Sequence, residues 1–322
     1  MLVSDRRRPE PLMLVPLAVC RRHGLARLEF IDFGLADYNA PLIDRTFALA
    51  LAEGGFPALW RRILAAVGPV DTIHLSNLPE SIGGVPNPFL QLPCRPSAMS
   101  YHTVLDGGFE GFLKARSTRL MADTRTKRRR LERQGQVAFQ VIGDAGEVDR
   151  AIDALIEQKS RRYQFIGAVD IFLNPDFRDF YRNIAKCEVS SGFVHLSVLT
   201  LDDRIVAVHL GIVFQDRMYM LMPAFDLDRF AAVSPGRLLL LEMVRWCCDH
   251  GVRVFDFTTG NEQYKSDWTD RTMAIHVFDQ GVSARGRVLI RGQAVYRRFK
   301  ARYPGLVQKL KAIRVKLLNR GW

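Results

Sequence analysis

The chain has 322 residues, of which 48% are hydrophobic and 25% are charged, and its formal net charge is +12. This length and composition are typical of a globular protein with one or two domains. No run reaches the roughly 18 apolar residues that a membrane span needs, so the sequence does not predict a transmembrane helix.

The cysteines indicate a reduced, cytoplasmic protein. Their number is odd and no CxxC pair occurs, so neither a disulfide framework nor a zinc site is expected, and no metal is predicted. The five are Cys20, Cys94, Cys187, Cys247 and Cys248. Arginines at positions 6–8 and the apolar run that follows imitate a secretory signal, but Pro16 interrupts that run, and a strand is expected instead.

The first third of the chain mixes strand and helix patterns. The predicted strands are residues 12–19, 25–33, 71–75 and 98–104, and the predicted helices are residues 44–52 and 56–67. Residues 79–96 contain five prolines, and they predict an irregular loop. Gly107-Gly108 ends this portion.

The middle of the chain alternates helices and strands and predicts a mixed α/β sheet with helices on both faces. The predicted helices are residues 109–133, 147–163, 176–189 and 236–250, and the predicted strands are residues 136–142, 194–201, 205–214 and 217–223. Asp202-Asp203 and Gln215-Asp216 predict tight hairpin turns. Residues 125–133 hold six basic side chains. A solvated helix face, a contact with phosphate groups, and nucleic-acid binding all fit this run.

Ser234-Pro235-Gly236-Arg237 opens the helix at residues 236–250. The start of a helix offers unpaired N–H groups and a partial positive charge, so it suits a diphosphate. Gly236 allows a close backbone approach, and Arg237 could pair with a phosphate oxygen. An ordinary N-cap by Ser234, without any ligand, is the alternative.

A polar turn after the strand at residues 252–257 predicts the wall of an active site. Residues 258–261 break regular structure around Gly260, and the ionisable Glu262, Tyr264, Lys265 and Asp267 follow. A polar surface loop is the alternative. A last strand is expected at residues 274–278.

The net charge is concentrated in the C-terminal tail. Residues 285–322 contain twelve lysines or arginines and no acidic residue, so the rest of the chain is balanced. Tyr303, Leu306, Val307, Leu310, Ile313 and Leu317 follow helical spacing. A basic amphipathic helix can dock on its own domain, lie on an anionic membrane, or bind an acidic partner.

The three-strand meander, the SPG helix start and the DFxxGxExYKxxW segment at residues 256–268 resemble the GNAT (Gcn5-related N-acyltransferase) superfamily. Within it the chain is similar to the branch of cellulose-biosynthesis-associated acetyltransferases that is related to the FemAB transferases. No GxGxxG, Walker A, HExxH or GxSxG motif occurs. The resemblance implies tandem GNAT-like α/β domains with mixed sheets flanked by helices: a degenerate half at residues 1–107, an acyltransferase domain at 108–284, and a basic helical tail at 285–322.

The resemblance implies transfer of an acyl group from acyl-CoA, such as acetyl-CoA, to an amine or hydroxyl of a sugar or a lipid-linked envelope or exopolysaccharide precursor. The candidate catalytic residues are His209 and Asp256 as base or orienting group, Tyr264 as proton donor to the thiolate, and Lys265 as anion holder. The candidate donor-binding residues are Ser234, Pro235, Gly236 and Arg237. A core role for His209, a turn-fastening role for Asp256 and a solvated Lys265 are the alternatives.

Two other functions stay open. A FemAB-like enzyme would use an aminoacyl-tRNA donor, for which the basic helix would grip the RNA; without such a donor, nucleic-acid binding is not expected. A non-catalytic component of a polysaccharide-synthesis complex would keep the fold alone. The tail further predicts peripheral contact with the inner face of the membrane.

Overall fold

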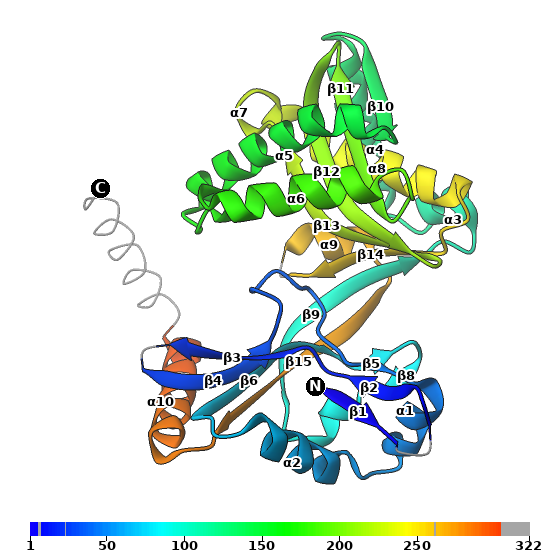
Figure 1. Cartoon of the computed structure of the whole chain (residues 1–322). Coiled ribbons are helices and arrows are strands. Elements are labelled where there is room, and N and C mark those ends of the chain that lie inside the picture. The colour runs from blue at the N-terminus through cyan, green and yellow to red at the C-terminus, as the bar shows by residue number, and fades with distance from the viewer. Residues whose placement is uncertain (6–7, 23, 261, 304–322) are drawn as a thin grey trace. The chain divides into compact units, whose positions relative to one another are not determined.

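In the computed structural model, residues 1–5, 8–22, 24–260 and 262–303 are described, and the chain forms two compact units (Figure 1). Unit 1 contains Met1–Met99 and the segment that starts at Met273, and unit 2 contains Ser100–Thr272. The bounds predicted at residues 107 and 284 followed breaks in the sequence. The compact units divide elsewhere because the last strand and the helix after it return to unit 1.

Unit 1 has a mixed sheet in the order β15-β6-β4-β3, and a small sheet in the order β1-β2-β5. Its strands are β1 Leu2–Ser4, β2 Pro11–Leu14, β3 Leu17–Arg22, β4 Leu25–Phe30, β5 Leu42–Ile43, β6 Thr72–Pro79, β7 Ser81–Ile82, β8 Val85–Pro86 and β15 Arg271–Gly281, and its helices are α1 Arg45–Ala52, α2 Phe56–Val67, η1 Pro88–Gln91 and α10 Ala284–Arg302. Only β4 and β6 pair in parallel in the larger sheet.

Unit 2 has a mixed sheet in the order β10-β11-β12-β13-β14-β9. Its strands are β10 Val137–Ile142, β11 Val194–Leu201, β12 Arg204–Phe214, β13 Arg217–Phe225 and β14 Val254–Thr259, and β9 Arg95–Val104 enters from unit 1. Its helices are α3 Gly108–Lys114, α4 Thr118–Glu132, α5 Ala145–Ile166, η2 Ile171–Leu173, α6 Pro175–Glu188, α7 Leu227–Phe230, η3 Ala231–Val233, α8 Pro235–Asp249 and α9 Gln263–Trp268.

Both faces of the unit 2 sheet are covered, as Figure 1 shows, and each face has its own hydrophobic core. Helices α5 and α6 bury one face, where Leu155, Leu196 and Leu210 pack together. Helix α8 buries the other face, where Leu239, Met218 and Phe255 meet. Because β12 is enclosed on both sides, Val206–Leu210 is a continuous buried run rather than an alternating one. The predicted α/β class, with mixed sheets flanked by helices, is confirmed.

The single helix predicted at residues 109–133 is wrong, because the chain breaks between α3 and α4. Ser117 caps α4 by accepting a hydrogen bond from the Leu120 N–H at 3.2 Å. Just before it, the Arg116 guanidinium lies over the Phe112 ring, 5.0 Å from its centroid, so the connection is pinned to the core. The break itself lies at Ser117, whose backbone is extended with ψ of 139° and cannot continue the helix.

Two smaller expectations also need correction. The single strand predicted at residues 12–19 is two strands, β2 and β3, separated by Val15-Pro16, because proline cannot donate a ladder hydrogen bond. The break in regular structure predicted from residue 258 begins later, because Thr258 and Thr259 belong to β14, and the sequence predicts no helix where α9 forms. The predicted turn residue Asn261 and the predicted helical positions after Tyr303 lie outside the described residues.

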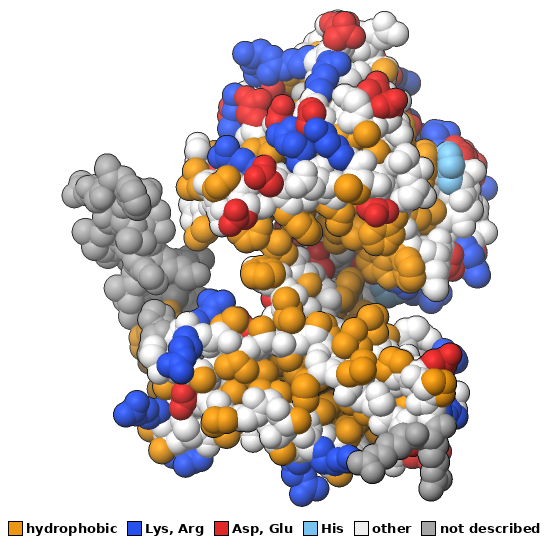
Figure 2. Space-filling model, in the orientation of Figure 1, with side chains coloured by type: hydrophobic (Ala, Val, Ile, Leu, Met, Phe, Trp, Pro, Cys, Tyr) orange, Lys and Arg blue, Asp and Glu red, His pale blue; other side chains and the backbone are white. Residues whose placement is uncertain are grey.

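The outer surface of α5 and α6 is highly charged. Figure 2 shows basic and acidic side chains interspersed over these helices, and Arg182 pairs there with Asp149 at 2.6 Å and with Asp153 at 2.7 Å. Exposed pairs of this kind are worth little stability, typically about 0–1 kcal/mol each. Among the described helices, none combines the length and the apolar content that crossing a membrane requires.

Candidate functional site

The only parallel pairing among the described strands of unit 2 joins β13 and β14, and it is short. Arg217, Met218 and Tyr219 face Val254, Phe255 and Asp256. Beyond Tyr219 the pairing ends, although β13 continues to Phe225. Two strands that separate within a sheet leave main-chain donors and acceptors for another partner, so the divergence is a candidate place for an extended ligand that carries amide groups.

Asp256 lies at the point where the strands separate, and its carboxylate is 2% exposed. Its Oδ2 accepts a hydrogen bond from Arg217 Nη1 at 2.8 Å, and its Oδ1 accepts one from the Thr258 N–H at 2.8 Å. Thr258 has φ of 59°, a conformation that β-branched residues rarely adopt. Its hydroxyl donates to the Met220 carbonyl across the divergence at 3.3 Å. Asp256 therefore fastens a strained turn, and such strain is concentrated at functional sites.

Lys265 folds beneath the turn and is almost enclosed, at 4% exposed. Its Nζ donates to the Thr259 carbonyl at 2.6 Å and lies 3.3 Å from Glu262 Oε2. Gly260 has φ of +152°, and a Cβ there would stand 2.6 Å from this Nζ. The positive φ favours glycine here, and a larger residue would displace the ends of the Glu262 and Lys265 side chains. The solvated lysine considered from the sequence is wrong.

The side chains of Tyr264 and Trp268 project from α9 into different environments. Tyr264 is 39% exposed, and burial, followed by the Glu262 carboxylate, raises the pKa of its phenol, so it keeps its proton at neutral pH. Trp268 is buried and stacks on Phe112 with 6.1 Å between the ring centroids. Trp268 anchors the helix, which leaves Tyr264 near the surface and Lys265 underneath.

The start of α8 is in contact with α4. Ser234 is in the left-handed region, with φ of 48°, and does not cap α8 with its side chain. Its hydroxyl instead accepts a hydrogen bond from Lys127 Nζ at 3.0 Å, and Arg237 Nη1 pairs with Asp123 Oδ2 at 2.5 Å. Gly236 lies against β13, because a Cβ there would be 2.9 Å from the Phe225 ring. The small residue is needed for this packing, and two cations stand at the helix start.

His209, on β12, is completely buried, and neither ring nitrogen has a hydrogen-bond partner among the described residues. Burial holds the pKa of His209 well below its ordinary value, so the ring is neutral. The nearest aromatic neighbour recorded for it is His195, on β11, 5.7 Å away between centroids. Its role as a base stays a prediction.

Sequence reasoning missed Arg217, Thr258 and Lys127. The strand that carries Arg217 was predicted, but nothing in the sequence shows that β13 lies beside β14. Lys127 belongs to the basic run that was noticed, while its target Ser234 is 107 positions away. Within the described ranges, no three His, Cys, Asp or Glu side chains are grouped to hold a metal ion.

Residues 117–266 match the sequence profile of the acetyltransferase (GNAT) domain family. This region is the part of unit 2 that carries the meander, α8, the β13–β14 divergence and the turn above Lys265. Residues 117–266 therefore form a GNAT-type acyltransferase domain. The family predicted from the sequence motifs is confirmed. Among curated proteins, no sequence matches the chain.

Several solved structures share the fold over most of both chains. FemX has a TM-score of 0.55 and 13% identity, covering 90% of this chain and 88% of that one. L-PGS from Bacillus licheniformis has a TM-score of 0.53 and 11% identity, covering 90% and 89%. The C-terminal domain of a proposed lysylphosphatidylglycerol synthetase from Agrobacterium fabrum has a TM-score of 0.52 and 12% identity, covering 87% and 89%. At such identities the likeness concerns the fold.

Proposed function

We propose that this enzyme transfers an acyl group from acyl-CoA, with acetyl-CoA as the simplest donor, to an amine or hydroxyl of a sugar or lipid-linked envelope or exopolysaccharide precursor. The observation that carries the proposal is the divergence of β13 and β14 next to the cation-bearing start of α8. The acceptor class is supported by the neighbour from Agrobacterium fabrum, whose name, lysylphosphatidylglycerol synthetase, includes a lipid.

The donor fits the divergence in two parts. The pantetheine arm of CoA carries two amides, which can pair with the main chain of β13 beyond Tyr219. The CoA diphosphate would sit at the start of α8, where Lys127 and Arg237 supply positive charge in addition to that of the helix N-terminus. Asp123 currently pairs with both cations and would have to yield one of them to the phosphate.

The chemistry needs a proton acceptor and a proton donor. The acceptor nitrogen or oxygen attacks the thioester carbonyl, its bond to carbon forms, the carbon–sulfur bond breaks, and its proton passes to a base. Asp256 orients the acceptor or takes this proton. Tyr264 gives its proton to the departing thiolate, and the partial exposure of its side chain leaves the phenol within reach of a ligand. Lys265 places a positive charge beside the turn, where it stabilises the developing oxyanion.

Acetyl-CoA binding tests the donor. We expect the wild-type chain to bind acetyl-CoA in a calorimetric titration, and the double variant Lys127→Gln/Arg237→Gln to bind at least about tenfold more weakly, because two charged contacts to phosphate are lost. This variant is preferable to a large side chain at Gly236, which would collide with Phe225 and disturb the fold.

The matched control is Arg130→Gln, which removes an exposed cation from the same helix. It should leave the affinity unchanged. A folded wild-type chain that does not bind acetyl-CoA would rule out the donor, and equal affinity of wild type and double variant would remove the diphosphate from the start of α8.

A second donor, an aminoacyl-tRNA, is favoured by the outer surface of α4. Among its basic residues, several are exposed: Arg119, Arg129 and Arg130, with Arg133 at the end of the helix. An array of this kind can neutralise RNA phosphates. A screen of CoA thioesters against charged tRNA separates the two donors, because only one of them will yield an acylated product. Absence of turnover with both would favour a non-catalytic component of a polysaccharide-synthesis complex.

We further propose that α10 makes peripheral contact with an anionic membrane. The Gly286 backbone packs against the Asp71 carbonyl, and Ile290 and Ala294 are half-buried on the same side. The opposite side of the helix is apolar and exposed, and consists of Val288, Leu289, Val295, Tyr296, Phe299 and, at its end, Tyr303. Exposed arginines flank this stripe at positions 287, 291, 298 and 302, and α10 contains no acidic residue. Such a helix suits a lipid interface.

Flotation with vesicles of phosphatidylcholine and phosphatidylglycerol tests this contact. We expect Val295→Glu/Phe299→Glu to reduce the bound fraction about tenfold, because burying charge in the interface is unfavourable. Phe214→Glu alters an exposed apolar residue of unit 2 and should have no effect. A chain ending at Tyr303 measures what the remaining tail adds. Wild-type flotation by the double variant would show that α10 is not the contact.

A further inference from the structure

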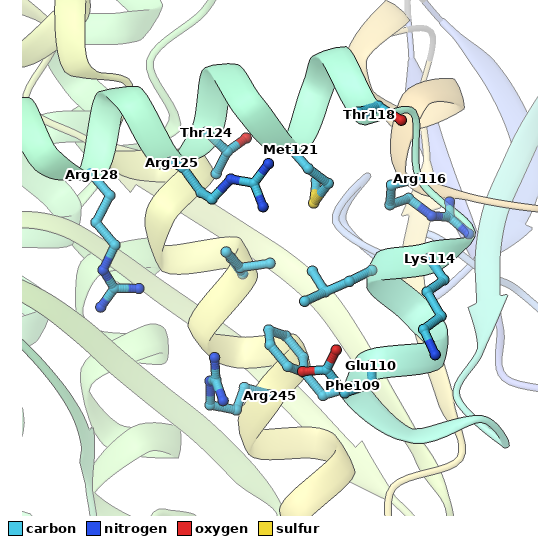
Figure 3. Close-up of a pocket in the computed structure, with 12 residues that line it drawn as sticks. Phe109, Glu110, Lys114, Arg116, Thr118, Met121, Thr124, Arg125, Arg128 and Arg245 are labelled. Atoms are coloured by element: carbon cyan, nitrogen blue, oxygen red, sulfur yellow. The ribbon is translucent and has the colours of Figure 1, made fainter.

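Unit 2 contains a pocket that no step of the proposed reaction uses. It has a volume of about 590 Å³, within the range typical of small-molecule sites, and lies between α3, α4 and α8 (Figure 3). Its lining includes five basic side chains: Lys114, Arg116, Arg125, Arg128 and Arg245. Arg125 projects from α4 into the hollow in Figure 3.

The charge of the pocket is only partly balanced. Glu110 is the single acidic lining residue. Arg128 is paired, since it contacts both Glu132 and Glu242. Lys114 and Arg125, by contrast, have no ion-pair partner within the described part of the chain. A concave surface with excess guanidinium and ammonium groups is a binding site for an anion, and arginine forks match phosphate oxygens.

Arg116 gives a second, independent indication. The residue is 7% exposed, and its Nε finds no hydrogen-bond acceptor in the described residues. Burial lowers the pKa of its guanidinium, and the Asp270 carboxylate opposes this shift. A buried donor without a partner is unfavourable by about 1–3 kcal/mol, so an incoming acceptor would remove that penalty.

The rest of the lining indicates what the anion is attached to. Leu113, Met121 and Leu241 form an aliphatic surface. Phe109 also lines the pocket, but the Arg245 guanidinium already covers its ring at 4.0 Å from the centroid. No exposed aromatic face is therefore left on which a nucleotide base could stack. An aliphatic chain fits this surface better than a base does.

We propose that this pocket binds a phosphate or diphosphate ester of an aliphatic chain, such as a prenyl or acyl phosphate. Lys114 and Arg125 contact the phosphate group, and Leu113, Met121 and Leu241 contact the first carbons of the chain. A lipid-linked acceptor has this chemistry. The binding itself does not depend on the acyl transfer proposed above or on its donor.

Calorimetric titration of the full-length chain with farnesyl phosphate tests the proposal. We expect farnesyl phosphate to bind at least about tenfold more tightly than farnesol, inorganic phosphate or AMP, because each of these lacks one of the two recognised groups. Arg125→Gln should weaken farnesyl phosphate binding about tenfold, and Leu113→Ser should weaken it without improving the binding of inorganic phosphate. Arg129→Gln, one helical turn along α4 and outside the pocket, should change nothing.

Three outcomes would overturn the proposal: no binding of farnesyl phosphate, equal binding by wild type and Arg125→Gln, or AMP binding as tightly as farnesyl phosphate. Thermal unfolding of each variant checks that it is folded. Acetyl-CoA titrated into the same samples reports separately on the donor site, so failure of one proposal is distinguishable from failure of the other.

Discussion

Replacing Lys265 with methionine is expected to slow acyl transfer by about 100-fold or more and to lower the free energy of unfolding by about 2 kcal/mol. The stability is lost because the buried Nζ no longer donates to the Thr259 carbonyl at 2.6 Å, a charge-assisted hydrogen bond of a kind typically worth about 1.5–3 kcal/mol. The activity is lost because one preorganised electrostatic donor commonly contributes about 10²–10³ in rate. Single-turnover kinetics and urea denaturation measure the two effects.

Two further variants test whether the position of the Lys265 amine matters in addition to its charge. Lys265→Arg keeps the charge, but its larger head does not fit where Gly260 already approaches Nζ, so activity should remain low. Lys186→Met removes a half-exposed lysine from α6 and should alter neither quantity beyond about 0.5 kcal/mol or twofold. A Lys265→Met enzyme with normal turnover would show that the lysine only braces the turn.

The elements predicted best were those whose limits are set by local chemistry. The helix predicted at residues 56–67 is α2, and the strand predicted at residues 194–201 is β11, with the same bounds. The meander was predictable because its hairpins turn at residues that tolerate a left-handed backbone. Asp202 and Gln215 both have positive φ, at 45° and 55°.

The elements predicted poorly depend on contacts between distant residues. In residues 109–133 the helical pattern continues across the break, and the packing of α4 depends on contacts such as that of Lys127 with Ser234, 107 positions away. The same is true of α9, where six residues form a helix because Trp268 packs against Phe112 from another helix. A helix this short gains little from propensity, so tertiary packing decides it.

In the candidate site, too, the sequence identifies residues but not their distant partners. Sequence motifs drew attention to Asp256, Tyr264 and Lys265, because several ionisable groups around a glycine turn are unusual. They could not show that Lys265 lies beneath Gly260, nor that Asp256 pairs with Arg217, 39 residues away. They marked Gly236 as a donor-binding residue, which stays a prediction, and they could not show that it packs against Phe225. Chemistry-bearing residues can be found in a sequence, but their partners are set by which strands become neighbours.

Asp256→Ala is expected to lower the free energy of unfolding by about 3 kcal/mol. The variant leaves the Arg217 guanidinium without its partner and the Thr258 N–H without its acceptor, and breaking a buried ion pair from one side typically costs about 3–5 kcal/mol. The lower end applies because the Arg217 side chain is 31% exposed, so water screens part of the loss. Urea denaturation of wild type and variant measures this difference.

Two comparisons reveal what the carboxylate does. Asp256→Ala combined with Arg217→Met should be less destabilised than the sum of the single variants, by about 1–2 kcal/mol, since both act on one pair. Asp256→Asn keeps an acceptor for the Thr258 N–H, so it should lose only about half as much stability as Asp256→Ala. If Asp256→Asn is stable yet transfers acyl groups about 100-fold more slowly, the charge takes part in the chemistry. If the loss of activity is explained by the loss of folded protein, Asp256 only holds the turn. Another group must then take the proton from the acceptor.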